Sequence, residues 1–242
     1  MHSLAQNLNK EFHESNPVPT SCPGRSPNGP VGPSSVLPCP LRPPSVHVGS
    51  VAPRHKPLLL LPSLPVPSPD RPLRTAPLVF FDLETTALRP DRGGRICEMA
   101  VVDHEGIAFD WTSVENPPPD AAVARQCPRL LDALKNQVVV GHNLSFDFRF
   151  VTYECRRLSA RGHSGLDLRY IDTLGLARSL LDAPNDYELG TLLAHFNAAP
   201  EETLHTAVGD ALATRTLFWH LVDAGDLTTL ADAGVKRLRW HG

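Results

Sequence analysis

The stretch VFFDLETTAL (residues 79–88) joins an apolar run to two carboxylates, Asp82 and Glu84. On an extended chain, residues i and i+2 share a face, so both side chains point the same way, about 7 Å apart along the strand. Two like charges held side by side are unfavourable unless a cation or a proton lies between them. The stretch alone is equally consistent with a buried strand that runs out into a polar turn and with a strand that ends in a cation site.

The composition of the chain changes near residue 77. Of the 25 prolines, 18 lie in residues 1–77 of the 242. Proline interrupts helices and central strands, and a segment rich in Pro, Ser and Gly lacks the side chains to bury a core. We therefore expect residues 1–76 to form a disordered Pro-rich tail and residues 77–242 to form one folded domain.

Charge divides along the same line. Residues 1–76 carry seven Lys and Arg and three Asp and Glu, which leaves 16 and 23 for residues 77–242. An acidic domain is a poor non-specific binder of nucleic acid unless cations neutralise its carboxylates locally. The basic tail is consistent with contacts to phosphates and equally with a solubilising linker.

Cysteine usage and hydropathy predict a cytoplasmic protein with no membrane contact. The five cysteines are scattered (positions 22, 39, 97, 127 and 155), form no CxxC pair and have no zinc-type spacing, which is typical of reduced thiols. The N-terminus is polar and shows no secretory signal. The apolar run PLLLLP (57–62) is too short to cross a membrane.

The domain is predicted to begin with three strands, followed by alternating helices and strands. Apolar and β-branched runs predict strands at 77–84, 95–106, 107–114, 138–143 and 170–172. Helical spacing of apolar residues predicts helices at 122–135, 144–160, 173–181, 186–196 and 205–222. The short links between the first three strands favour an antiparallel meander. The predicted fold is α/β, with a mixed five-stranded sheet that resembles the ribonuclease H-like sheet and is flanked by helices.

Further acids follow the other elements. Asp147 comes just after the strand at 138–143, and ligands in open α/β sheets collect at the carboxyl ends of strands. Taken alone, Asp147 is equally typical of a surface acid in the first turn of a helix. His205 and Asp210 are five residues apart, which on one helix places them about 140° apart. They serve one site only if His205 precedes the helix that carries Asp210.

Four carboxylates and one histidine at element ends on one side of a sheet indicate a shared site. Hard oxygen ligands suit Mg²⁺ or Mn²⁺ better than zinc. Clustered carboxylates without Cys or paired His ligands are typical of a two-metal phosphoryl-transfer centre.

Three segments resemble a known family. DLETT (82–86), HNLSFD (142–147) and HTAVGD (205–210) resemble the three motifs of the DEDDh (DnaQ-like) 3′–5′ exonucleases, which include the proofreading epsilon subunit of bacterial replicative DNA polymerase. The resemblance covers about residues 78–222, and RICEMAVV (95–102) and YIDTLGLAR (170–178) support it.

The resemblance implies a metal-dependent enzyme that removes nucleoside 5′-monophosphates from single-stranded or frayed 3′ ends. It favours DNA, in proofreading or repair, over RNA, and a polymerase subunit is the candidate partner. Two divalent cations, Mg²⁺ or Mn²⁺, are expected on Asp82, Glu84, Asp147 and Asp210, with His205 as the general base that takes a proton from the attacking water. The expected contacts to the terminal nucleotide are Thr85, Thr86, Leu88 and Asn143. Capping of the next helix explains Asn143 equally well.

Two departures from the family pattern bear on the substrate. Ala87 stands where relatives usually have Gly, and residues 115–131 run into a helix without the segment resembling HGIT that often walls the nucleotide pocket. A second hypothesis is therefore a non-catalytic or weakly catalytic module that binds nucleic acid or a partner, whose Pro-rich tail recruits partners in extended form. Retention of His205 argues against it, because a pure binder has no need of a general base.

Overall fold

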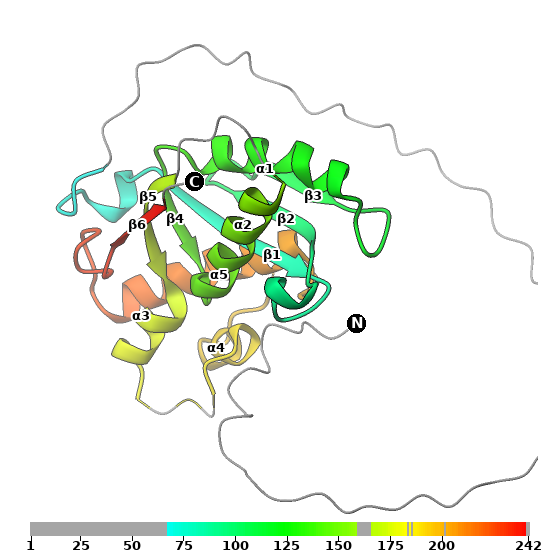
Figure 1. The fold of residues 1–242 in the computed structure, drawn as a ribbon. Coiled ribbons are helices and arrows are strands. Elements are labelled where there is room, and N and C mark those ends of the chain that lie inside the picture. Colours follow the sequence, from blue (N-terminus) through cyan, green and yellow to red (C-terminus); the bar gives the residue numbers. More distant parts are fainter. Residues whose placement is uncertain (1–66, 159–165, 183, 185, 201, 241–242) are drawn as a thin grey trace, which may run out of the picture. The chain divides into compact units, whose positions relative to one another are not determined.

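The computed structural model describes residues 67–158, 166–182, 184, 186–200 and 202–240. Residues 1–66 of the expected tail, with Cys22 and Cys39, lie outside this part. The described residues form a mixed six-stranded sheet in the order β3-β2-β1-β4-β5-β6. Helices cover both faces of the sheet (Figure 1). None of the helices in the described part is long and apolar enough to cross a membrane.

The strands are β1 (Leu78–Thr85), β2 (Ile96–Val102), β3 (Ile107–Thr112), β4 (Val138–Gly141), β5 (Leu166–Asp172) and β6 (Lys236–Trp240). The first three form the expected antiparallel meander. Strand β4 lies between β1 and β5 and is parallel to both, which explains its run of valines buried on both faces.

The helices are α1 (Asp120–Leu134), α2 (Leu144–Arg157), α3 (Thr173–Leu180), α4 (Leu189–His195) and α5 (Ala207–Ala224), with short 3-10 turns η2 (Leu73–Thr75) and η3 (Pro90–Arg92). Helices α1 and α2 pack on one face of the sheet, and α3, α4 and α5 pack on the other (Figure 1). The core is therefore two hydrophobic layers separated by the sheet.

Strand β1 contributes to both layers because its side chains alternate. Phe81 and Leu83 belong to the layer under α1 and α2, whereas Phe80 belongs to the layer under α5. Asp82 and Glu84 continue the row that Phe80 begins. The alternation of the strand thus directs both carboxylates toward α5.

The expected number of strands was wrong, because β6 adds a sixth strand antiparallel to β5. Its sequence KRLRW is mostly basic and did not predict a strand, but charged residues are common on edge strands that border solvent. Structure also extends ahead of residue 77. Leu73 is 1% exposed, and its N–H donates a hydrogen bond to the Thr228 carbonyl (2.9 Å).

Candidate functional site

Three carboxylates meet at the carboxyl end of β1. Asp82 and Glu84 come from the strand, and Asp210 comes from the first turn of α5, which packs on that face. One ligand oxygen from each lies within 4.8 Å of the other two. An all-oxygen set at this spacing fits a hard divalent cation such as Mg²⁺ or Mn²⁺.

Asp147 adjoins this cluster from α2. It is 3% exposed and accepts a hydrogen bond from the Leu83 backbone, so it is not a surface acid on its helix. Burial raises the pKa of Asp147, and the nearby charges of Asp172 and Glu84 raise it further. The four predicted acids therefore lie close together.

The electrostatics of the cluster oppose simultaneous ionisation of its carboxylates. Burial raises the pKa of Asp82 well above its usual range, and the charges of Asp147, Asp210 and Glu84 add to the shift. Burial, followed by Asp210 and Glu98, raises the pKa of Glu84 to about 7. Without a counter-ion, these groups resist ionising together at neutral pH.

Glu98 is a fifth carboxylate, which the sequence did not single out. It lies on β2 directly opposite Glu84. Like charges at opposed positions of an antiparallel pair are destabilising. The Glu98 Oε2 atom accepts the N–H of Ala207 (3.1 Å) at the start of α5, where the helix dipole favours a negative charge. Only the β1–β2 register reveals this position.

His205 precedes α5, as its spacing from Asp210 required. Its φ of 71° is in the left-handed region, and its N–H donates to Asp210 Oδ1 (3.0 Å). Thr206 caps the helix by accepting the Gly209 N–H (3.0 Å). The His205 side chain is exposed, and its charge interaction with Asp210 places it beside the cluster.

Thr85 and Thr86 shape the turn after β1. The Thr85 hydroxyl donates to the Ala87 carbonyl (3.0 Å). Thr86 pairs with Arg95 twice: its N–H donates to the Arg95 carbonyl (2.9 Å), and its hydroxyl accepts the Arg95 N–H (3.0 Å). Ala87 is not among the residues with positive φ, so alanine in place of the usual glycine causes no backbone strain. Leu88 packs partly buried against the core.

Asn143 stands at the N-cap of α2, but its side chain makes no capping hydrogen bond. Its φ is 64°, its side-chain oxygen accepts the Ser145 hydroxyl (3.2 Å), and its N–H donates to Asp172 Oδ1 (2.9 Å). Capping therefore does not explain this asparagine. Asp172, at the end of β5, caps α3 through the Leu174 N–H (3.1 Å) and so links two neighbouring strand ends.

An ion-pair network supports the same region. Glu154 of α2 is fully buried and pairs with Arg95 (2.7 Å) and Arg157 (2.7 Å). Both arginines also pair with Asp120, the first residue of α1 (2.9 Å each). Because Arg95 also holds Thr86, the network joins α1 and α2 to the turn after β1.

A family model described as "Exonuclease" matches residues 114–218. That range contains Asp147, His205 and Asp210 and begins after Asp82 and Glu84.

Several curated proteins share similar sequences. A DNA polymerase III PolC-type of Oceanobacillus iheyensis is 32% identical over 174 residues, 63% of this chain and 12% of that protein. A DNA polymerase III subunit epsilon-like protein of Rhodobacter capsulatus is 30% identical over 200 residues, 72% of this chain and 28% of that protein. The 3′-5′ exonuclease DinG of Bacillus subtilis is 28% identical over 185 residues, which are 66% of this chain and 19% of that protein. The matches thus span 12% to 28% of the length of these relatives.

Among solved structures, S. pombe Pop2p with Mg²⁺ and Mn²⁺ bound gives a TM-score of 0.47 at 12% identity, covering 62% of this chain and 84% of that chain. The nuclease domain of 3′hExo, a DEDDh family member bound to rAMP, gives a TM-score of 0.44 at 11% identity and covers 61% of this chain and 92% of that chain. In its three acidic motifs the chain resembles the DEDDh (DnaQ-like) exonucleases, and residues 114–218 match the exonuclease family model.

Proposed function

We propose that this chain is a metal-dependent 3′–5′ exonuclease that removes nucleoside 5′-monophosphates from single-stranded or frayed 3′ ends. The observation that carries the proposal is the meeting of Asp82, Glu84 and Asp210, with ligand oxygens within 4.8 Å of one another. Such a cluster is costly in its ionised form unless cations occupy it, and cations held beside a phosphodiester are a means of hydrolysing it.

Each carboxylate has a distinct part in this proposal. Asp82, Glu84 and Asp210 are the ligands for two divalent cations, Mg²⁺ or Mn²⁺, and Asp147 supports them from α2. When bound, the cations lower the pKa of the attacking water and offset charge on the scissile phosphate and the leaving oxygen. The protein's contribution is to hold these oxygens on two rigid elements, a central strand and a helix.

His205 is the proposed general base. Its backbone is tied to Asp210 and its imidazole is exposed beside the cluster, where a water and the terminal phosphate have access. Imidazole suits the transfer because it ordinarily titrates near neutral pH. Thr85, Thr86, Leu88 and Asn143, which lie at or just after the ends of β1 and β4, are the proposed contacts to the terminal nucleotide.

DNA is the favoured substrate over RNA, and a polymerase is the proposed partner. DLETT resembles the epsilon type of the motif, and two of the relatives carry DNA polymerase III in their names. The alternative is a binding module of low activity. The short connection from β3 to α1, residues 113–119, supports it because little chain is left there to wall a nucleotide pocket.

The decisive experiment uses the full chain and single-stranded DNA and RNA of one sequence, labelled at the 5′ end, with Mg²⁺ or Mn²⁺. We expect stepwise shortening from the 3′ end, with release of nucleoside 5′-monophosphates, and loss of this activity in Asp82→Ala and His205→Ala. Asp110→Ala, an exposed acid on the edge strand β3, serves as the matched control.

A strand with a blocked 3′ end should resist degradation, while a blocked 5′ end should make no difference. Wild-type protein that leaves both polymers intact would contradict the enzyme and favour the binding module. Shortening from the 5′ end would contradict the proposed polarity.

A further inference from the structure

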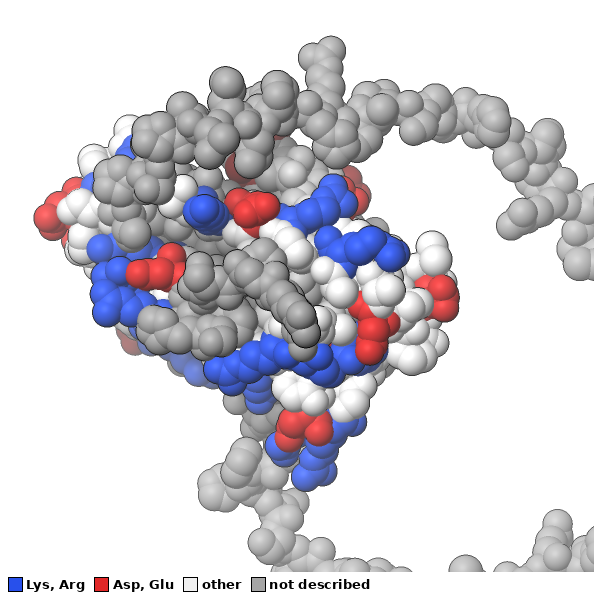
Figure 2. Space-filling view, turned by 45° about the horizontal axis from the view of Figure 1, so that its top comes forward, with Lys and Arg blue, Asp and Glu red and all other residues white. Residues whose placement is uncertain are grey.

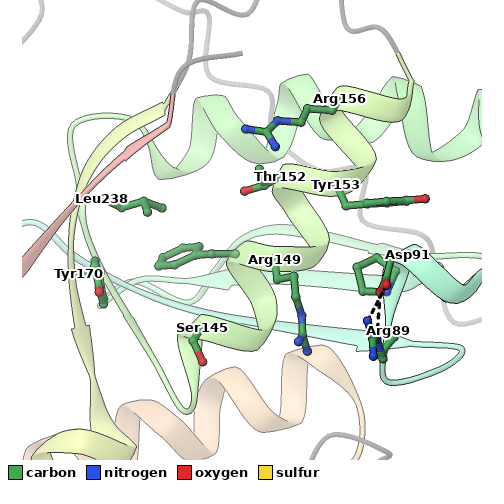
Figure 3. A pocket seen from close by; sticks show the side chains of 11 residues that line it. Arg89, Asp91, Ser145, Arg149, Thr152, Tyr153, Arg156, Tyr170 and Leu238 are labelled. Atoms are coloured by element: carbon green, nitrogen blue, oxygen red, sulfur yellow. Dashed lines mark hydrogen bonds and ion pairs between the residues drawn. The ribbon is translucent and has the colours of Figure 1, made fainter.

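A second feature lies on the outward face of α2, the helix that carries Asp147. A cavity of about 630 Å³ is lined there by side chains from α2, from η3 and the residue before it, and from β5 and β6. Figure 3 shows Ser145, Arg149, Thr152, Tyr153 and Arg156 projecting from the helix, with Arg89 and Asp91 to one side and Tyr170 and Leu238 to the other. We call this cavity the α2 groove. The side chains that carry the argument are Arg89, Arg149, Arg156, Phe148, Tyr153 and Tyr170.

The α2 groove is basic although the domain is acidic. Residues 77–242 carry 16 Lys and Arg against 23 Asp and Glu, yet the groove is lined by three arginines and one acid. That acid, Asp91, pairs with Arg89 through two hydrogen bonds (3.1 and 2.6 Å). Arg149 and Arg156 add two further positive charges to the lining. Lys and Arg side chains also form a band across the face that Figure 2 presents, with separate patches of acids.

Aromatic rings lie among these arginines. Phe148 is a buried ring of the core and meets Tyr170 edge to face, with ring centroids 5.3 Å apart. Tyr153, on the next turn of α2, is partly exposed and is the ring of the helix that a base can reach. Guanidinium groups that pair with phosphates, interleaved with rings on which bases stack, are the combination that binds single-stranded nucleic acid. Paired bases of a duplex leave no free face for such stacking.

The α2 groove begins at the proposed terminal-nucleotide contacts. The Ser145 hydroxyl donates to Asn143, and Arg149 donates to the Leu88 carbonyl (3.3 Å). From Ser145 to Arg156 the helix rises about 16 Å. A strand whose 3′ end lies at the carboxylate cluster thus has a basic, aromatic surface directly alongside.

We propose that the α2 groove binds the unpaired segment just upstream of the 3′-terminal nucleotide, with Arg149 and Arg156 on its phosphates and Tyr153 under a base. The proposal rests on the proposed exonuclease function. Binding in the α2 groove explains how an acidic domain holds nucleic acid beyond the carboxylate cluster. It also means that the groove itself selects unpaired strands, in addition to the requirement for an unpaired 3′ end.

Binding of a 12-nucleotide oligothymidylate to the full chain, followed by fluorescence anisotropy in chelator so that no hydrolysis occurs, tests the groove. Arg156→Gln should weaken binding and lower the slope of log K against log salt concentration by about 0.7. Tyr153→Ala should weaken binding about tenfold with the slope unchanged. Arg125→Gln, on the exposed surface of α1, removes the same charge outside the groove and should leave both quantities unchanged.

Equal affinities for wild type, Arg156→Gln and Tyr153→Ala would overturn the proposal, as would a blunt duplex that binds as tightly as the single strand. The two substitutions lie on the outward face of α2, so unfolding is checked by the Tm of each. Because binding is measured without hydrolysis, a chain that binds through the groove but does not cleave refutes the exonuclease alone. A chain that cleaves while the substitutions change nothing refutes the groove alone.

Discussion

The backbone N–H of His205 donates a hydrogen bond to the carboxylate of Asp210 (3.0 Å) across the start of α5. His205 is outside the helix with a φ of 71°, and Asp210 is inside it and 5% exposed. The bond ties the proposed base to a proposed metal ligand. One oxygen of Asp210 also lies within 4.8 Å of ligand oxygens of Asp82 and Glu84.

His205→Asn removes the imidazole and should keep the backbone hydrogen bond, so it tests the two roles of this residue separately. Asparagine adopts the left-handed region readily, so the N–H contact to Asp210 should persist. We expect hydrolysis to fall about 10²- to 10⁴-fold, the usual contribution of a positioned base, while the Tm stays near the wild-type value. His104→Asn, in the exposed turn between β2 and β3, is the control and should hydrolyse normally. Full activity in His205→Asn would exclude His205 as the base.

Gly209→Ala should distort the turn that carries His205 at the start of α5. A Cβ at this position would clash with the Thr203 carbonyl oxygen and crowd the capping hydroxyl of Thr206. We expect a loss of about 1–3 kcal/mol in the free energy of unfolding and reduced hydrolysis, because the turn that carries His205 must shift.

The matched control for that change is Gly175→Ala in α3, where an added Cβ meets nothing within 4 Å. In a helix, alanine there should stabilise the fold by about 0.5–1 kcal/mol. Thermal or denaturant unfolding measures both variants. Gly209→Ala that is as stable and as active as wild type would show that the turn has room to adjust.

The pH dependence of stability and of Mn²⁺ affinity should follow the titration of Glu84. In the metal-free protein its pKa is raised from 4.5 to about 7, first by burial and then by Asp210 and Glu98. The folded state therefore holds a proton that the unfolded state has lost between about pH 4.5 and 7. Stability in chelator should fall as pH rises through that window. Mn²⁺ must displace the proton, so Mn²⁺ affinity should rise toward pH 7 and level off above it.

Tm measurements from pH 5 to 8.5, in chelator and at several Mn²⁺ concentrations, check both trends. Glu84→Gln has no proton to lose, so its difference from wild type isolates this group: in chelator the variant should gain relative stability as pH rises. Mn²⁺ should raise the Tm of wild type more than that of Glu84→Gln. A difference that does not change with pH would contradict the raised pKa.

The buried network should matter more than any exposed ion pair. Glu154→Gln leaves Arg95 and Arg157 without their buried counter-charge, and we expect a loss of about 3 kcal/mol in unfolding free energy. KM for oligonucleotides should rise as well, because Arg95 holds the turn at Thr86. Asp167→Asn breaks an exposed pair with Arg237 and should cost less than about 1 kcal/mol. Equal losses in the two variants would refute the special role of the buried network.

Local patterns were enough to predict most of the elements. The alternation of VFFDLET requires β1 to bury residues on both faces and to present Asp82 and Glu84 together, since side-chain direction along a strand is a property of the backbone. The 3.6-residue period likewise required His205 to lie ahead of α5. The basic edge strand β6 escaped prediction because its pairing with β5, rather than its composition, makes it a strand.

Proximity between distant segments depends on register and packing. Glu98 joins the cluster only because the β1–β2 register sets it opposite Glu84. Asp147 is buried at the site only because α2 leads away from β4 at a strand end. Its place in the first turn of a helix is, taken alone, equally typical of a surface acid. The repulsion implied by DLETT is local, because residues i and i+2 of one strand share a face. Long-range packing alone brings five carboxylates from four elements together at one site suited to cations.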